Sequence, residues 1–153
     1  MKNLLFICTG NICRSPTAHA LALHQIKKLG LKNIVVDSAG ISGVHVGEKP
    51  DSRAVAVGRK RGVDFSGIFS RQIEAEDFVK FDLIFAMDRG HISALRKICP
   101  PQFQDKIQLF LEYADVENRF NDEVIDPYYG GVEGFVEVFE LIEKGTREII
   151  IND

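Results

Sequence analysis

The features that this sequence lacks exclude several classes of protein. It has no tryptophan and only three cysteines in 153 residues, and an odd, small number of cysteines argues against the disulfide framework of a secreted domain. No apolar run approaches the roughly 20 residues that a membrane-spanning helix needs. The run "LLFIC" near the start is too short for a signal-peptide core and lacks a small-residue cleavage site. We therefore expect a cytoplasmic protein that does not enter a membrane.

Cofactor and nucleic-acid sites also find little support. The formal net charge of −3 gives no general attraction for nucleic acid, and neither GxGxxG nor GxxxxGK[ST] occurs. There is no CxxC pair, His19 and His24 are five positions apart, and His45 and His91 stand alone. None of these spacings matches a helical metal-binding pair. We expect no metal or other cofactor, and each histidine is interpreted as a surface or satisfied polar residue.

Hydrophobic periodicity indicates an α/β domain. No repeat or composition break divides the chain, so residues 1–153 are expected to form one domain. Short apolar runs predict strands over 4–8, 34–38, 82–87 and 106–111, and helical spacing predicts helices over 16–29, 52–62, 74–81, 90–98 and 132–150. Such alternation favours parallel strands joined by right-handed crossovers. Ligands then bind beyond the carboxyl ends of the strands, where 8–16, 38–46 and 87–90 lie.

The segment "CTGNICRSP" (8–16) stands at that edge, between the first predicted strand and helix. Ser15 is expected to cap the helix, and Pro16 tolerates the first turn because its missing N–H would have no partner there. The free N–H groups and partial positive charge of the helix start face the preceding loop. Cys8, in that field and near Arg14, is expected to be a thiolate at neutral pH.

The Cys-x5-Arg spacing leaves two interpretations. In the first, Cys8 is simply a small buried apolar residue. In the second, the loop curls round a tetrahedral anion, with backbone N–H groups as a cradle and Arg14 binding two oxygens. Gly10 gives the backbone freedom and Asn11 tolerates the left-handed conformation that such a curl requires. The strand before it, the helix after it and the serine next to the arginine favour a phosphate-binding loop.

Three segments together resemble the low-molecular-weight protein tyrosine phosphatases: "CTGNICRSP", "DSAG" (37–40) and "DPYYGG" (126–131). The similarity runs over essentially the whole chain. It implies a four-stranded, twisted parallel sheet with helices on both faces. It also implies hydrolysis of phosphotyrosine and aryl phosphate monoesters through a cysteinyl-phosphate intermediate, without a metal. Phosphotyrosine proteins are the expected partners, a cognate tyrosine kinase is a candidate partner, and the expected state is a monomer.

The resemblance also assigns residues. Cys8 matches the nucleophile, Arg14 the phosphate clamp, and Asp126 the general acid that becomes a base in the second step. By itself, "DPYYGG" would be interpreted as a turn. Ser15 matches a hydrogen-bond donor to the sulfur. The residues expected to bind phosphate or support the loop are Thr9, Gly10, Asn11, Ile12, Cys13, Ser15 and Ser38.

The chain departs from the family pattern at three positions. Tyr128 and Tyr129 match the aromatic wall beside the substrate ring, but position 44, often aromatic, is Val44 here. Compared with relatives that have the aromatic residue, this protein is expected to show a weaker preference for aryl over small alkyl phosphates. Positions 19 and 68 commonly carry an acidic residue and a histidine that lie near each other and the loop, whereas this chain has His19 and Ile68. That polar pair is therefore expected to be missing.

Two other functions remain open from the sequence. A thioredoxin-coupled arsenate reductase would share the loop, but its relay needs two cysteines beyond the nucleophile, and outside the loop there is only Cys99. A non-catalytic phosphate or phosphoprotein binder would keep the cradle without needing the thiol or the acid. Asp88, at the end of a predicted strand, is expected to cap a helix, with tuning of the site as its alternative role.

Overall fold

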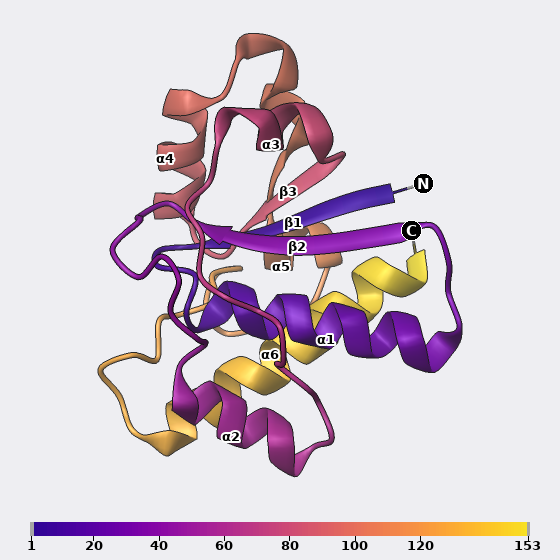
Figure 1. The fold of residues 1–153 in the computed structure, drawn as a ribbon, viewed down its shortest axis with the longest axis vertical. Helices are drawn as coiled ribbons and strands as arrows, with labels where there is room; N and C mark the ends of the chain where they lie inside the picture. Colours follow the sequence, from indigo (N-terminus) through magenta and orange to yellow (C-terminus); the bar gives the residue numbers. More distant parts are fainter. Residues whose placement is uncertain (1, 153) are drawn as a thin grey trace.

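A computed structural model describes residues 2–152, which form one sheet with helices around it (Figure 1). Its four strands run parallel in the order β2-β1-β3-β4. They are β1 (Lys2–Cys8), β2 (Ile34–Gly40), β3 (Leu83–Ala86) and β4 (Ile107–Leu109). The single-domain α/β fold with a four-stranded parallel sheet, expected from the sequence, is therefore confirmed.

Helices cover both faces of the sheet (Figure 1). α1, α2, α5 and α6 lie on one side, and α3 and α4 on the other. Their bounds are α1 (Arg14–Leu29), α2 (Ser52–Lys60), α3 (Ala75–Lys80), α4 (Arg89–Ile98), α5 (Phe110–Ala114) and α6 (Val132–Asn152), with a 3₁₀ segment at Pro101–Lys106. None of these helices within residues 2–152 combines the length and apolarity needed to cross a membrane.

The central strand β1 shows why the apolar run at 4–8 has no polar alternation. Side chains alternate between the two faces of a strand. Leu4 and Phe6 enter the core shared with α1 and α6, whereas Leu5 and Ile7 enter the core shared with α3 and α4. All four are fully buried. Because both faces are covered over this part of the strand, residues 4–8 are apolar without alternation.

One predicted strand is partly wrong. The run at 106–111 forms strand only over Ile107–Leu109, and Phe110 begins α5. Phe110 and Leu111 are both buried in the core shared with α1 and α6. Consecutive strand residues would point to opposite faces of the sheet, so a helical turn is what places both side chains in the same core. Elsewhere the predicted elements occur, with ends shifted by up to two residues.

Candidate active site

A pocket of about 300 Å³ opens at the carboxyl edge of the sheet, where the loops after β1 and β2 meet a loop that precedes α6. Segments distant in the sequence contribute its walls. It is lined by Cys8, Thr9, Gly10, Ile12, Cys13, Arg14, Ser42, Val44, His45, Asp126, Tyr128 and Tyr129. The structure thus brings together most of the site residues that the sequence suggested. Asn11, Ser15 and Ser38 lie buried behind this surface.

The loop after β1 is held in its curled shape by buried side chains. Asn11 adopts the left-handed conformation, with φ of 56°. Its Nδ2 donates to Ser15 Oγ at 2.8 Å, and its Oδ1 accepts from the backbone N–H of Arg71 at 3.0 Å. Ser70 Oγ donates to the carbonyl of Gly10 at 2.9 Å. A segment some 60 residues away in the sequence therefore fixes the loop from outside.

The role expected for Ser15 as helix cap is wrong. The N-cap of α1 is Cys13, which makes no side-chain capping bond, and Ser15 lies inside the first turn. Its hydroxyl is fully buried and lies 2.9 Å from Cys8 Sγ, while Asn11 donates to it. Because Ser15 lies inside the helix and not at the N-cap, its hydroxyl contacts the loop instead of capping the backbone. Pro16 does stand in the first turn, where its lack of an N–H removes no helical bond.

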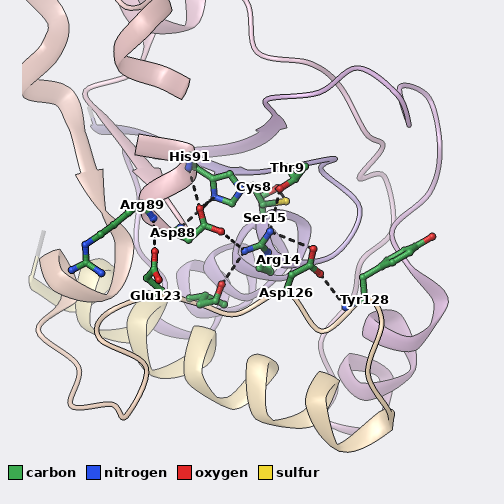
Figure 2. Close-up of polar contacts among 11 residues, drawn as sticks. Cys8, Thr9, Arg14, Ser15, Asp88, Arg89, His91, Glu123, Asp126 and Tyr128 are labelled. Carbon is green, nitrogen blue, oxygen red and sulfur yellow. Dashed lines mark hydrogen bonds and ion pairs between the residues drawn. The ribbon is translucent and has the colours of Figure 1, made fainter. Parts of the chain in front are cut away.

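Arg14 is buried and held from below the pocket (Figure 2). Its Nη1 donates to Asp88 Oδ2 and to the carbonyl of Val124, each at 2.9 Å. Nη2 donates to Thr9 Oγ1 at 3.2 Å and lies 3.6 Å from Asp126 Oδ2. Figure 2 shows the two carboxylates on opposite sides of the guanidinium. One end of Arg14 is therefore anchored in the protein, and the other faces the pocket.

Asp126 stands at the open side of this pocket, with a side chain that is about half exposed. It accepts a hydrogen bond from the backbone N–H of Tyr128 at 2.9 Å, which gives "DPYYGG" the local turn expected from its composition. Tyr128 and Tyr129 pack edge to face with ring centroids 5.0 Å apart, and Arg53 lies over the Tyr128 ring. Tyr129 is 93% exposed.

Val44 and His45 form another part of the rim. Val44 is 80% exposed and lines the pocket as a small apolar side chain. The His45 ring lies so close to the loop that a Cβ on Gly10 would meet its Cδ2 at 2.8 Å. His45 Nδ1 is 2.9 Å from Glu48 Oε2. Sequence reasoning missed His45 because a lone histidine between small residues has no distinguishing spacing.

Asp88 serves both as helix cap and as partner of the buried arginine. Its Oδ1 accepts from the backbone N–H of His91 at the start of α4, and its Oδ2 accepts from Arg14. Burial alone would raise the pKa of Asp88, but contacts with His91 and Arg14 outweigh it and lower the pKa below its usual value. The carboxylate is therefore ionised at neutral pH. Burial and the nearby Arg14 charge lower the pKa of His91 to about 4, so its ring is neutral there.

The departures at 19 and 68 have different surroundings. His19 Nδ1 lies 2.9 Å from Ser38 Oγ, so a polar contact between position 19 and strand β2 is present despite the change of residue. Burial lowers the pKa of His19, although the Asp37 charge opposes this. Ile68 is buried in the apolar cluster that also contains Cys13 and Ala54. An apolar contact thus stands where the family pattern has a histidine.

The two remaining thiols lie in separate cores. Cys13 packs on the α1 side of the sheet and Cys99 on the α4 side. Burial, reinforced by the nearby Cys8, raises the pKa of the Cys13 thiol, which is therefore protonated at neutral pH. Within residues 2–152, no three histidine, cysteine or acidic side chains are grouped as metal ligands would be.

Comparisons with known proteins match most or nearly all of this chain to members of one family. The model of the low molecular weight phosphotyrosine protein phosphatase family matches residues 3–152. Bacillus subtilis YfkJ, named a low molecular weight protein-tyrosine-phosphatase, is 39% identical over 98% of this chain and 94% of its own. The Schizosaccharomyces pombe low molecular weight phosphotyrosine protein phosphatase is 40% identical over 88% and 86%. A crystal structure of an Entamoeba histolytica protein tyrosine phosphatase, with Hepes in its active site, has a TM-score of 0.92 and 38% identity, covering 99% of this chain and 96% of that one.

Proposed function

Because the chain belongs to the low molecular weight phosphotyrosine protein phosphatase family, we propose that it hydrolyses phosphotyrosine and other aryl phosphate monoesters through a cysteinyl-phosphate intermediate. The observation that carries this proposal is the position of Cys8. Its sulfur contacts the Ser15 hydroxyl at the base of a pocket that Arg14 and Asp126 also line. A nucleophile, an anion clamp and a proton donor therefore share one small cavity.

In the first step the phosphoryl group binds in the loop, where backbone N–H groups and Arg14 Nη2 stabilise its oxygens. The Cys8 thiolate attacks phosphorus, an S–P bond forms and the P–O bond to the aryl group breaks. Asp126 gives its proton to the leaving oxygen, which would otherwise depart as a phenolate. Its exposed position beside Arg14 suits a group that must meet the substrate from the open side.

In the second step water attacks phosphorus, the S–P bond breaks and Asp126 takes the proton from the water. Inorganic phosphate leaves and the Cys8 thiolate is restored, so one ester and one water yield one phenol and one phosphate. Ser15, 2.9 Å from the sulfur, donates a hydrogen bond that makes the thiolate a better leaving group. Its burial keeps this hydroxyl in place.

The rim of the pocket suits an aromatic substrate. Tyr128 and Tyr129 form one wall, and Val44 stands on the rim as a small, exposed side chain. We assign residues 1–153 to a single phosphatase domain that acts as a monomer in the cytoplasm. Its partners are phosphotyrosine proteins, and a cognate tyrosine kinase is a candidate partner.

The test is turnover of p-nitrophenyl phosphate in the presence of a metal chelator, together with the binding of inorganic phosphate. The parent protein should turn over. Cys8→Ser should lose turnover but keep phosphate binding, because the amide cradle and Arg14 remain. Arg14→Ala should lose both. Phosphate binding without turnover by the parent would contradict the proposal and indicate a binding module, and equal phosphate affinity in the two variants would contradict the assigned roles.

A further inference from the structure

Thr9 lies between the pocket and the side chains of Arg14 and His91. Its Oγ1 lies 2.9 Å from His91 Nε2 and 3.2 Å from Arg14 Nη2. Thr9 is exposed on the pocket side, whereas His91 is only 5% exposed. Figure 2 shows Asp88 and His91 on one side of the Arg14 guanidinium and Thr9 beside Cys8. The direction of each hydrogen bond in this group follows from two groups that can only donate, the backbone N–H of Asp88 and the Arg14 guanidinium.

The backbone N–H of Asp88 settles which nitrogen of His91 carries the hydrogen. This N–H donates to His91 Nδ1 at 3.2 Å, so Nδ1 must be the unprotonated acceptor. Nδ1 also lies 3.2 Å from Asp88 Oδ1, but a hydrogen on Nδ1 would be directed against the backbone N–H. The neutral ring, consistent with its lowered pKa, then carries its hydrogen on Nε2 and donates to Thr9.

The same reasoning determines what the Thr9 hydroxyl can do. A hydroxyl accepts with two lone pairs and donates one hydrogen. His91 Nε2 and Arg14 Nη2 are both donors, and together they occupy both lone pairs of Oγ1. The hydrogen of Thr9 is therefore left for a partner on the remaining side, which is the side of the pocket. Without His91, the hydroxyl would be free to rotate and to accept instead.

We propose that Thr9 donates its hydroxyl hydrogen to a phosphoryl oxygen of the bound substrate, and that His91, itself held by Asp88, is the positioning residue that fixes this direction. The proposal rests on the proposed function for the identity of the substrate. It adds a side-chain donor to the backbone cradle. It also gives Asp88 and His91, at the start of α4, a role in substrate binding in addition to capping the helix.

The experiment measures the dissociation constant of inorganic phosphate by calorimetry, which does not depend on turnover, and kcat/KM for p-nitrophenyl phosphate. Thr9→Val keeps the shape and removes the hydroxyl, and Thr9→Ser restores the hydroxyl. His91→Asn is the matched control for the cap, since its amide can accept from the Asp88 N–H at the place of Nδ1 but is too short to reach Thr9. His91→Gln can place an N–H near the position of Nε2.

A hydrogen bond to a charged group is worth enough that Thr9→Val should weaken phosphate binding about tenfold or more. Thr9→Ser should recover most of this loss. His91→Asn should weaken binding several-fold in the parent but hardly at all in Thr9→Val, and His91→Gln should bind more tightly than His91→Asn. Unchanged phosphate affinity in Thr9→Val would overturn the proposal. An equal effect of His91→Asn in both backgrounds would show a merely structural role. If phosphate binding follows the predicted pattern without any turnover, only the proposed function fails.

Discussion

The native protein should lose stability as the pH falls from 7 to 5 because His91 is buried as a neutral ring. Its pKa is lowered from 6.5 to about 4, first by burial and then by the Arg14 charge. Between these two values the unfolded chain binds a proton that the native state does not, so the stability present above pH 6.5 decreases as the pH falls. Linkage gives a loss of about 2 kcal/mol between pH 7 and pH 5, and about 3 kcal/mol by pH 4.

The assay is urea unfolding at several pH values between 4.5 and 7.5, comparing the parent with His91→Asn. The variant keeps an acceptor for the Asp88 N–H but has no group that titrates, so its stability should depend less steeply on pH. His19, whose pKa burial also lowers, contributes to both proteins and therefore cancels in the comparison. If the two proteins show the same dependence on pH, His91 is not held neutral in the native state, and the assigned ring tautomer loses its support.

Three other predictions concern the acid, the rim and the core. Asp126→Asn should reduce kcat/KM much more for phenyl phosphate than for p-nitrophenyl phosphate, because the poorer leaving group needs the proton more; equal losses over a series of aryl phosphates would refute the general-acid role. Val44→Trp should raise kcat/KM for phosphotyrosine peptides about 2- to 13-fold. Inhibition by free phosphate should hardly change; an equal change in phosphate inhibition and in peptide turnover would mean that position 44 shapes the loop. Gly145→Ala should destabilise the protein by about 1–3 kcal/mol in urea unfolding, since its Cβ would lie 2.5 Å from the Phe110 ring; unchanged stability would show that α5 can move away from α6.

Most of the sheet was predictable because the central strands β1 and β3 are covered on both faces over their apolar runs, Leu4–Cys8 and Leu83–Ala86. The same property explains the failure at Phe110. An apolar run does not reveal where a strand ends and a helix begins, since both are buried. Only the packing of Phe110 and Leu111 on the same side of the sheet distinguishes the two.

Some features of the site were likewise predictable from the sequence, and others were not. Asn11 was predictable as a left-handed residue, because few residue types tolerate that conformation and the loop needs one. Ser15 next to Pro16 has the pattern of a cap, yet its hydroxyl serves the loop, and no local signal separates these roles. Ser70 and His91 reach the loop from distant segments. Contacts of that kind depend on how the chain folds back, which sequence spacing does not encode.

The measurement that tests the central claim most directly is the identification of the phosphorylated residue during turnover. The parent protein would be mixed with p-nitrophenyl phosphate, denatured rapidly, digested and analysed by mass spectrometry. We predict one phosphoryl group on Cys8, in the peptide that contains residues 8–14, and none on that peptide in Cys8→Ser. Turnover with a phosphoryl group on another residue would contradict the account. So would turnover by Cys8→Ser at the parent rate.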